Sequence, residues 1–432
     1  MTALTIRSVW LPGEVASELD ATMCKLTILI GRRNITEYTA ARARGGSSLD
    51  IPAYFLAEWM AENWWALLHE PKKDEEKDDP EYRERHSLLA AQHGFAVPNL
   101  SIMPVGRAIH VFATRHYAHL AGVTFERSAA ADASRLEIEG VLKNFISGCI
   151  DLLVHHGFKD TPLQQAWRLV EATADDQREF CELAGALGLS PYNADDDIAN
   201  SFDLLVDVLG TRATRDLCLA STPSVLLRTT DAAQEIASKI DAAPDADIAA
   251  LSQMSLPDDN FHAPGWRRGL EAARKLAREF RLDNGKANAA DVVFERLGID
   301  PSKRADALSL GSNGRGWLPF NCAIRRNDTT ARVAIVPEDE TQRRFAAARA
   351  VYFAWISKPQ EQRLATAAVT RDQQASRQFG AEILVPRAYL EAQAVRGVLS
   401  YGQAHDIAEK RRASPWVVYY QANNSGIRVG SI

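Results

Sequence analysis

Residues 343–356 read RRFAAARAVYFAWI, and this stretch decides how the second half of the chain is interpreted. Its apolar residues recur at the spacing of an α-helix, so we expect a helix with a large buried face. Arg349 stands at the centre of that pattern, although a buried charge without partners is strongly destabilising. The stretch therefore raises the question of what this helix was built to hold.

Residues 373–386 read QQASRQFGAEILVP, which predicts a second helix that Pro386 ends. Together the two stretches resemble the active-site helices of the ImmA/IrrE family of zinc metallopeptidases, whose motifs run roughly RFxxAHExxH and ExEANxFAAELLMP. Arg344, Phe345 and Ala348 match the frame of the first motif, and FGAEILVP matches the end of the second. The resemblance covers residues 260–432 and implies a zincin-like domain there.

The residues that carry the family's chemistry are missing from both motifs. In HExxH the two histidines share one helix face and bind one zinc ion, while the glutamate acts as general base. A guanidinium carries only hydrogen-bond donors and cannot ligate a cation. We therefore predict no zinc, no other cofactor and no peptidase activity. The degenerate positions, which the resemblance assigns to the two histidines, the glutamate and two carboxylates of the second motif, are Arg349, Phe353, Ala350, Gln373 and Ala375.

The resemblance also predicts how the altered residues lie. Arg349 and Phe353 should face one site together with Gln373, and Phe353 should fill that site with apolar bulk. We expect Arg349 either to reach solvent, where it is a candidate contact for an acidic partner, or to pair with Glu382 or Asp372. No histidine occurs between residues 262 and 405, so no imidazole in this segment replaces the missing ligands.

The end of the chain predicts two short helices resembling a helix-turn-helix. Ser400 with Gln403 is typical of a capping box, and Ser414 with Pro415 starts the second helix. Such a pair either reads DNA or packs on the domain core. The candidate contacts for DNA or a partner here are Lys410, Arg411, Arg412, Gln421 and Asn424.

The remaining sequence predicts an α+β protein of three domains. Residues 1–128 mix strand-like and helical patterns, and residues 129–245 are helical, beginning with the capping signature of Ser134 and Glu137. Residues 241–266, rich in Pro, Asp and Ala, are interpreted as an interdomain connection. The C-terminal domain, residues 260–432, is the ImmA/IrrE-like one.

Composition limits the classes of function. The 432 residues are 46% hydrophobic and 25% charged, which is ordinary for a soluble protein, and the net charge of −6 gives no general attraction to nucleic acid. No apolar run is long enough for a membrane span. The five cysteines form no CxxC pair, and the N-terminus lacks a signal peptide pattern, so we expect reduced thiols and a cytoplasmic protein.

Three functions remain open. The leading hypothesis is a non-catalytic pseudopeptidase that acts as a bacterial regulator or scaffold through protein contacts. The resemblance implies a stress, mobile-element or phage-defence setting, with a repressor, toxin or defence-system subunit as partner and no membrane. One alternative is a DNA-binding transcriptional regulator that uses the C-terminal helix pair. The other is an enzyme with an unrecognised site in residues 1–240.

Overall fold

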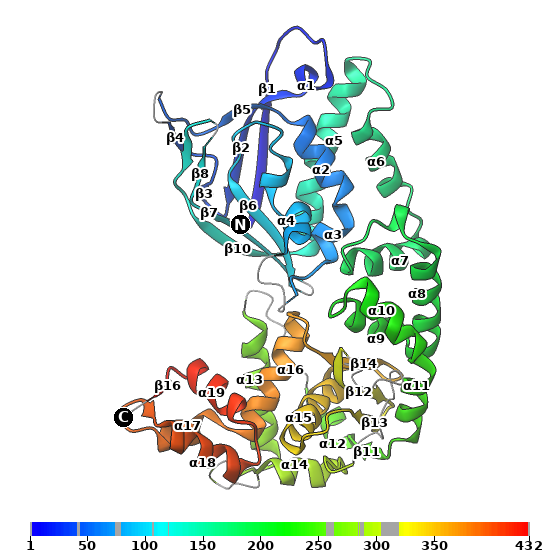
Figure 1. Ribbon diagram of the computed structural model, residues 1–432, viewed down its shortest axis with the longest axis vertical. Coiled ribbons are helices and arrows are strands. Elements are labelled where there is room, and N and C mark those ends of the chain that lie inside the picture. The colour runs from blue at the N-terminus through cyan, green and yellow to red at the C-terminus, as the bar shows by residue number, and fades with distance from the viewer. Residues whose placement is uncertain are drawn as a thin grey trace. The chain divides into compact units, whose positions relative to one another are not determined.

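The computed structural model describes residues 2–40, 44–73, 79–105, 108–119, 121–255, 263–283, 285, 289–303 and 319–430. Helices are interspersed with several small sheets, whose strands pair antiparallel except in one two-stranded sheet, as expected for an α+β protein. The chain divides into two compact units, Met1–Asp196 and Asp197–Ile432 (Figure 1). Within the described ranges, no helix combines the length and the apolar character that crossing a bilayer requires.

In the part of unit 1 that the structure describes, the helices pack around three small sheets. The largest sheet has β2 at its centre, with β1 on one side and β3 and β5 on the other. The elements are β1 (Leu4–Trp10), α1 (Glu18–Ala21), β2 (Met23–Ile30), β3 (Arg33–Asn34), β4 (Tyr38–Ala40), β5 (Leu49–Pro52), α2 (Tyr54–Glu62), α3 (Trp64–His69), α4 (Pro80–His86), η1 (Leu88–Ala91), β6 (Asn99–Val105), β7 (Ala108–Thr114), β8 (His116–Ala118), β9 (Val123–Phe125), β10 (Ala129–Ser134), α5 (Arg135–His155), α6 (Pro162–Glu171), α7 (Asp175–Ala186) and η2 (Pro191–Asn193).

Helix α5 begins where its sequence predicts, but its capping differs from the expected pattern. The Ser134 hydroxyl accepts a hydrogen bond from the main-chain N–H of Glu137 at 3.1 Å. The Glu137 carboxylate does not complete a capping box, because it instead accepts from the main-chain N–H of Ala3 at 2.6 Å. This bond ties the start of β1 to the first turn of α5. The buried face of the helix contains Ile138, Leu142, Phe145, Ile146, Cys149 and Leu153.

Unit 2 is built on one antiparallel sheet in the order β11–β13–β12–β14, with α15 packed across it. Its elements are α8 (Asp196–Leu209), α9 (Thr211–Cys218), α10 (Pro223–Asp231), α11 (Ala233–Ala242), β11 (Asp245–Asp247), α12 (Ala249–Gln253), α13 (Gly265–Glu279), α14 (Ala289–Leu297), β12 (Phe320–Arg326), β13 (Thr330–Ile335), α15 (Glu340–Ile356), β14 (Gln362–Thr366), α16 (Arg371–Leu384), α17 (Arg387–Gln393), β15 (Val398–Leu399), α18 (Tyr401–Arg411), α19 (Pro415–Asn424) and β16 (Arg428–Val429).

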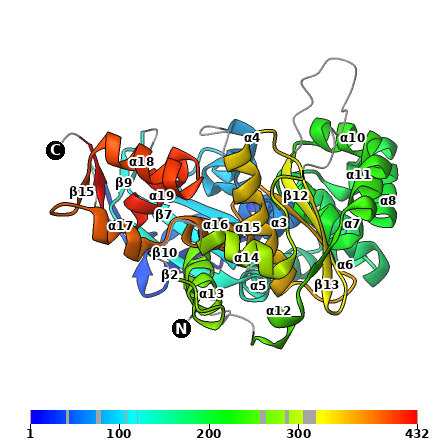
Figure 2. The same ribbon diagram turned by 90° about the horizontal axis from the view of Figure 1, so that it is seen from below.

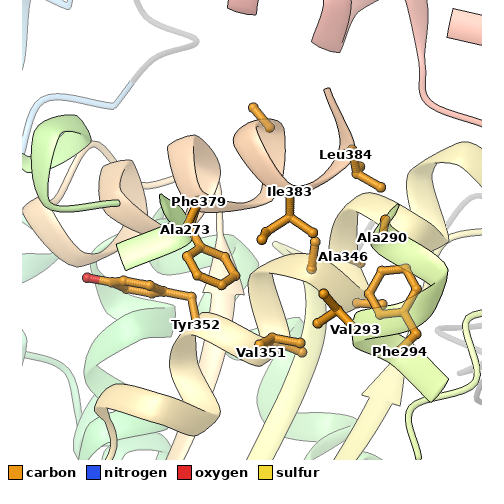
Figure 3. Packing of buried hydrophobic residues seen from close by; sticks show 14 of the residues in the cluster. Ala273, Ala290, Val293, Phe294, Ala346, Val351, Tyr352, Phe379, Ile383 and Leu384 are labelled. Atoms are coloured by element: carbon orange, nitrogen blue, oxygen red, sulfur yellow. The ribbon is translucent and has the colours of Figure 1, made fainter. Parts of the chain in front are cut away.

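The core of unit 2 lies between α15, α16 and the helices α13 and α14 beside them (Figure 2). Figure 3 shows Phe379 of α16 facing Tyr352 of α15, and their ring centroids are 5.5 Å apart. Helices α13 and α16 cross closely, because α13 carries Gly269 at the crossing. A Cβ atom there would overlap the main chain of Ala375. Glycine therefore lets the two helices approach each other.

The expected domain boundaries do not coincide with the division between the units. Strand β10 pairs with β7 across residue 128, so the first helices of the predicted middle domain belong to unit 1. The predicted connection, residues 241–266, contains β11, which pairs with β13 in the sheet of unit 2, and also α12. The three residues of β11 are Asp-Ala-Asp with only the alanine buried, a composition that is also typical of a loop. Residues 256–262 of that stretch lie outside the described residues.

Candidate functional site

Helices α15 and α16 and strand β14 bring the degenerate motif positions together. Asp339 caps the start of α15, where its side chain accepts from the main-chain N–H of Gln342 at 3.0 Å. Thr370 caps α16 in the same way through the N–H of Gln373, at 3.3 Å. Residues 346–355 of α15 are all buried, so the helix has no solvent face over these turns. The charge of Arg349 is therefore held inside the unit.

Arg349 is buried, with 2% of its surface exposed, and it donates three hydrogen bonds. Its Nη2 donates to the amide oxygen of Gln373 at 2.6 Å and to the main-chain oxygen of Thr366 at 2.7 Å. Its Nε donates to the hydroxyl of Ser376 at 3.1 Å. Burial lowers the pKa of Arg349, and the nearby charge of Arg377 acts in the same direction.

Neither of the two expected environments for Arg349 is observed. It does not reach solvent, and its hydrogen-bond acceptors are neutral groups. The two carboxylates proposed as its partners are bonded elsewhere. Glu382 accepts from Gln421 at 2.6 Å, and Asp372 pairs with Arg268 at 3.1 Å. The prediction was wrong because main-chain and amide oxygens, which a sequence pattern does not locate, take the place of a carboxylate.

Gln373 connects Arg349 to a buried ion pair. Its amide oxygen also accepts from the N–H of Thr366 at 3.0 Å, and its amide nitrogen donates to the oxygen of Leu364 at 2.7 Å and to Asp216 at 3.3 Å. A glutamine has two donors and two acceptor positions, and all four are used here. Gln373 is fully buried, so water does not compete for these bonds.

The ion pair joins Asp216 of α9 to Arg363 of β14, and both side chains are buried. Nε and Nη2 of Arg363 donate to the two carboxylate oxygens at 2.7 and 3.1 Å, a bidentate arrangement. The carboxylate also accepts from the N–H of Leu364 at 3.1 Å. The charges of Asp216 and of the neighbouring Asp372 raise the pKa of Arg363 against the effect of burial. The guanidinium lies 4.8 Å from the ring centroid of Phe353.

These contacts place Arg349, Phe353 and Gln373 around one site, as the alignment of the two motifs requires. Phe353, Ala350 and Ala375 are fully buried. The residues do not fit a metal ion, because a guanidinium stands at one predicted ligand position, a phenyl ring at the second, and a fully bonded amide at the third. Over the described ranges, no group of three or more His, Cys, Asp or Glu side chains is arranged to hold a metal.

The same side chains bond the main-chain N–H and C=O groups on the outer edge of the sheet. Strand β14 is an edge strand, and the outward main-chain groups of Leu364 and Thr366 face away from β12. Asp216 accepts from the N–H of Leu364, Gln373 bonds the oxygen of Leu364 and the N–H of Thr366, and Arg349 donates to the oxygen of Thr366. Three side chains thus take the place of a neighbouring strand along this edge.

Sequence reasoning missed Asp216 and Arg363. Asp216 lies in residues 129–245, which the sequence predicts to be a separate helical domain. The sequence offers one signal for each of these two residues. The acidic residue stands on the face of α9 that also buries Ala213 and Leu217, and Arg363 belongs to a strand, QRLAT, that is buried throughout. Charges on buried faces are uncommon unless they are paired.

The C-terminal helix pair is present, and Ser400 with Gln403 forms the predicted capping box. Three of its candidate contacts are internal. Gln421 is fully buried and bonds Glu382 and Gln378, while Asn424 donates to Gln378 at 3.2 Å. Arg411 is buried with its guanidinium 4.0 Å from the ring centroid of Tyr389.

The remaining two candidates are exposed. Lys410 and Arg412 lie on the surface, and Arg412 pairs with Glu340 of α15. The helix pair therefore packs through three of its five candidate contact residues, including both candidates for base reading, Gln421 and Asn424. Its exposed face carries aromatic side chains, among them Tyr401, Trp416 and Tyr420, which are 57%, 78% and 51% exposed.

The five cysteines are free and buried, as expected for reduced thiols. Comparison of the chain with models of protein families, with curated proteins and with solved structures finds no match. The resemblance to ImmA/IrrE peptidases accordingly rests on the two motifs and on the order of the elements around them.

Proposed function

We propose that unit 2 is a zinc-free counterpart of an ImmA/IrrE-like peptidase domain and that the protein works as a non-catalytic regulator or scaffold through protein contacts. The observation that supports this most directly is the position of Arg349. Its guanidinium lies where the resemblance places a zinc ligand, and its bonds to Gln373 and Thr366 make it part of the structure.

The chemistry of peptide hydrolysis has no substitute at this site. Ala350 offers no general base where the motif has glutamate, and Phe353 offers no ligand. The thiol of Cys322 lies close by, but it is fully buried and donates to the oxygen of Ala346 at 3.3 Å. Burial raises the pKa of Cys322 to about 12, which keeps the thiol protonated and unreactive at neutral pH.

Partner contacts in unit 2 are proposed to lie away from the former active site. An extended peptide can add to a sheet only where main-chain groups are free. On β14 these groups are bonded to Asp216, Gln373 and Arg349, so a partner segment cannot add to this edge as a further strand. The exposed aromatic face formed by Tyr401, Trp416 and Tyr420 is the more suitable surface, because such side chains are enriched in protein interfaces.

The setting follows from the resemblance alone. We propose a cytoplasmic location for the protein, and a repressor, a toxin or a subunit of a phage-defence system as the class of its partner. The observations favour contact with protein over reading of DNA, because Gln421 and Asn424 are bonded inside the unit.

Metal content and activity test the central part of the proposal. The full chain is incubated with zinc chloride, dialysed and analysed for metal, and it is then assayed for cleavage of casein. We expect far less than one zinc per chain and no cleavage. One bound zinc per chain that is lost in both Arg349→Ala and Gln373→Ala, but kept in the surface variant Arg267→Ala, would refute the proposal.

A second experiment distinguishes the proposed function from the DNA-binding alternative. Gln421→Ala should lower the free energy of unfolding by about 1–3 kcal/mol, because it leaves Gln378 and Glu382 without their buried partner. Binding to a random pool of DNA duplexes should show no preferred sequence in either protein. A preferred sequence whose affinity falls in Gln421→Ala, with unchanged stability, would favour the alternative.

A further inference from the structure

Strand β1 forms an open edge in unit 1, in contrast to the closed edge of β14. It pairs on one side only, with β2, and the hydrogen-bonded positions are its odd-numbered residues, as the bonds from Gly31 to Ala3 and from Leu11 to Met23 show. In an antiparallel pair the intervening residues turn their N–H and C=O groups to the other side. Ile6, Ser8 and Trp10 therefore present free main-chain groups, and no bond from these groups is found among the described residues.

A groove of about 440 Å³ follows this open edge, between β1 and α5. The helix contributes Val141, Asn144, Phe145 and Gly148, which share one face because they are spaced by three and four residues. Gly148 leaves room beside Trp10, since a Cβ atom there would come no closer than 3.6 Å to the indole. The helix and the strand are held together at one end by the bond from Ala3 to Glu137.

The groove contains no charged side chain among the described residues that line it. It is lined by apolar residues and by hydroxyl and amide groups, so it suits small apolar or uncharged side chains. The opposite face of β1 is exposed and carries Arg7 and Val9. No ion pair of Arg7 is found in the described part of the chain. A strand added beside β1 would place every second side chain in the groove and the others next to Arg7.

We propose that the edge of β1 binds an extended segment of a partner protein as an additional strand, with uncharged side chains in the groove beside α5 and an acidic residue beside Arg7. The free N–H and C=O groups of Ile6, Ser8 and Trp10 supply the main-chain bonds, which is how strand addition gains affinity. The guanidinium of Arg7 supplies the charge complementarity, since opposite charges on neighbouring strands attract.

Charge also distinguishes this partner from a second copy of the chain. If two copies of β1 paired antiparallel over their full length, Arg7 of one would lie directly opposite Arg7 of the other. Like charges in directly opposed positions destabilise a strand pair. A heterologous strand with an acidic residue at that position has no such penalty.

Ser8 provides a matched pair of variants. Its N–H faces the open edge, so Ser8→Pro removes one donor to the added strand and leaves the bonds between β1 and β2 intact, as proline is tolerated on edge strands. Ser8→Ala keeps the N–H and loses only the hydroxyl, so it controls for the side chain. Gly148→Leu fills the groove without changing the edge, and Gly148→Ala is its control.

The probe is a phage-displayed library of random dodecapeptides selected on the full-length chain. We expect enriched peptides that alternate uncharged with other residues and include Asp or Glu. Their affinity should fall by about tenfold or more in Ser8→Pro and in Gly148→Leu, and it should be unchanged in the two alanine controls. Amide exchange at Ile6, Ser8 and Trp10 should slow when the peptide is bound.

Three results would overturn the proposal. Selected peptides that bind Ser8→Pro and Ser8→Ala equally well, or no enrichment at all, would show that the edge does not accept a strand. A dimer of the wild-type chain in sedimentation, lost in Ser8→Pro and kept in Ser8→Ala, would identify a second copy as the occupant. Both variants lie in unit 1, so neither outcome depends on whether unit 2 binds zinc.

Discussion

The guanidinium of Arg349 donates to the amide oxygen of Gln373 over 2.6 Å, and this bond joins the two helices that carry the degenerate motifs. In the ImmA/IrrE resemblance the same two positions would be linked by a metal ion. A direct hydrogen bond between protein groups needs no ion and is independent of zinc supply. We therefore infer that the two helices stay connected by protein contacts alone.

Removal of the guanidinium should destabilise unit 2. Arg349→Ala removes the donor to the Ser376 hydroxyl and leaves the main-chain oxygen of Thr366 with only a long bond from Arg377 at 3.5 Å. It also creates a cavity, so we expect a loss of about 3–5 kcal/mol in the free energy of unfolding. Urea denaturation of the full chain measures it. Arg267→Ala, at an exposed ion pair on α13, should change the value by about 0.5 kcal/mol or less. Equal stability of both variants would contradict the buried position of Arg349.

The ion pair of Asp216 and Arg363 should show strong energetic coupling. Asp216→Asn leaves the buried guanidinium with only the longer contact to Asp372 at 3.3 Å and should cost about 3–5 kcal/mol. Arg363→Met should cost a similar amount, because the carboxylate is then unpaired. The double variant buries neither charge, so its loss should be smaller than the sum of the two single losses. A double-mutant cycle from urea denaturation gives the coupling, and simple additivity would refute the pairing.

Acid should destabilise unit 1 through Glu70. Burial raises the pKa of Glu70, but hydrogen bonds from Arg85 at 2.7 Å and from His86 at 3.0 Å lower it by more, so it lies below its usual value. A carboxyl group with a lowered pKa stabilises the folded state above its unfolded pKa, about 4.3, and this stability is lost as the pH falls. Thermal unfolding between pH 7 and pH 3 should show a smaller acid-induced loss of stability for Glu70→Gln than for wild type. Identical pH profiles for the two proteins would show that the Glu70 cluster contributes nothing to acid sensitivity.

Glu62, in the same unit, should affect the pH dependence of stability in the opposite direction. Partial burial and the neighbouring Glu58 raise the pKa of Glu62, so this group favours the folded state at low pH and disfavours it as the pH rises through the folded value. Glu62→Gln should therefore gain stability relative to wild type as the pH rises.

Two glycines in helices should respond in opposite directions to alanine. Gly269 lies at the crossing of α13 and α16, where a Cβ atom would lie 2.7 Å from the carbonyl carbon of Ala375. Gly269→Ala should cost about 1–3 kcal/mol or more, since the helices must separate. At Gly140, in α5, a Cβ atom would meet no other atom of the described residues within 4 Å, so Gly140→Ala should gain about 0.5–1 kcal/mol. Unchanged or higher stability of Gly269→Ala would contradict the close crossing.

The sequence predicted the elements better than their grouping. The period of the apolar residues located α15 and α16, and serine at a helix start located α5 and α18 correctly. These signals are local, because they depend on residues one or two turns apart. The division into domains depends on pairing between distant segments, such as β11 with β13, and a three-residue strand has no periodicity of its own.

The candidate site shows the same limit. The motif frame predicted that Arg349, Phe353 and Gln373 would meet, and the contacts of Gln373 and of Arg363 agree with that. The acceptors for Arg349 include a main-chain oxygen that every residue type carries, so no side chain marks it in the sequence. Gln421 and Asn424 resembled base-reading residues because amides suit both DNA edges and buried networks.

The bond between Asp216 and Arg363 has a consequence for synthesis of the chain. The two residues are 147 positions apart, and during translation at about 5–20 residues per second the aspartate is made roughly 7–30 s before the arginine. During that time the carboxylate of Asp216 in α9 lacks Arg363, and β14, the strand that α9 contacts, has not yet been made. Unit 2 can therefore complete its fold only late in translation. A fragment of residues 260–432 would keep Asp372, 3.3 Å from Arg363, but would lack the buried carboxylate of Asp216 that holds this arginine in a bidentate arrangement.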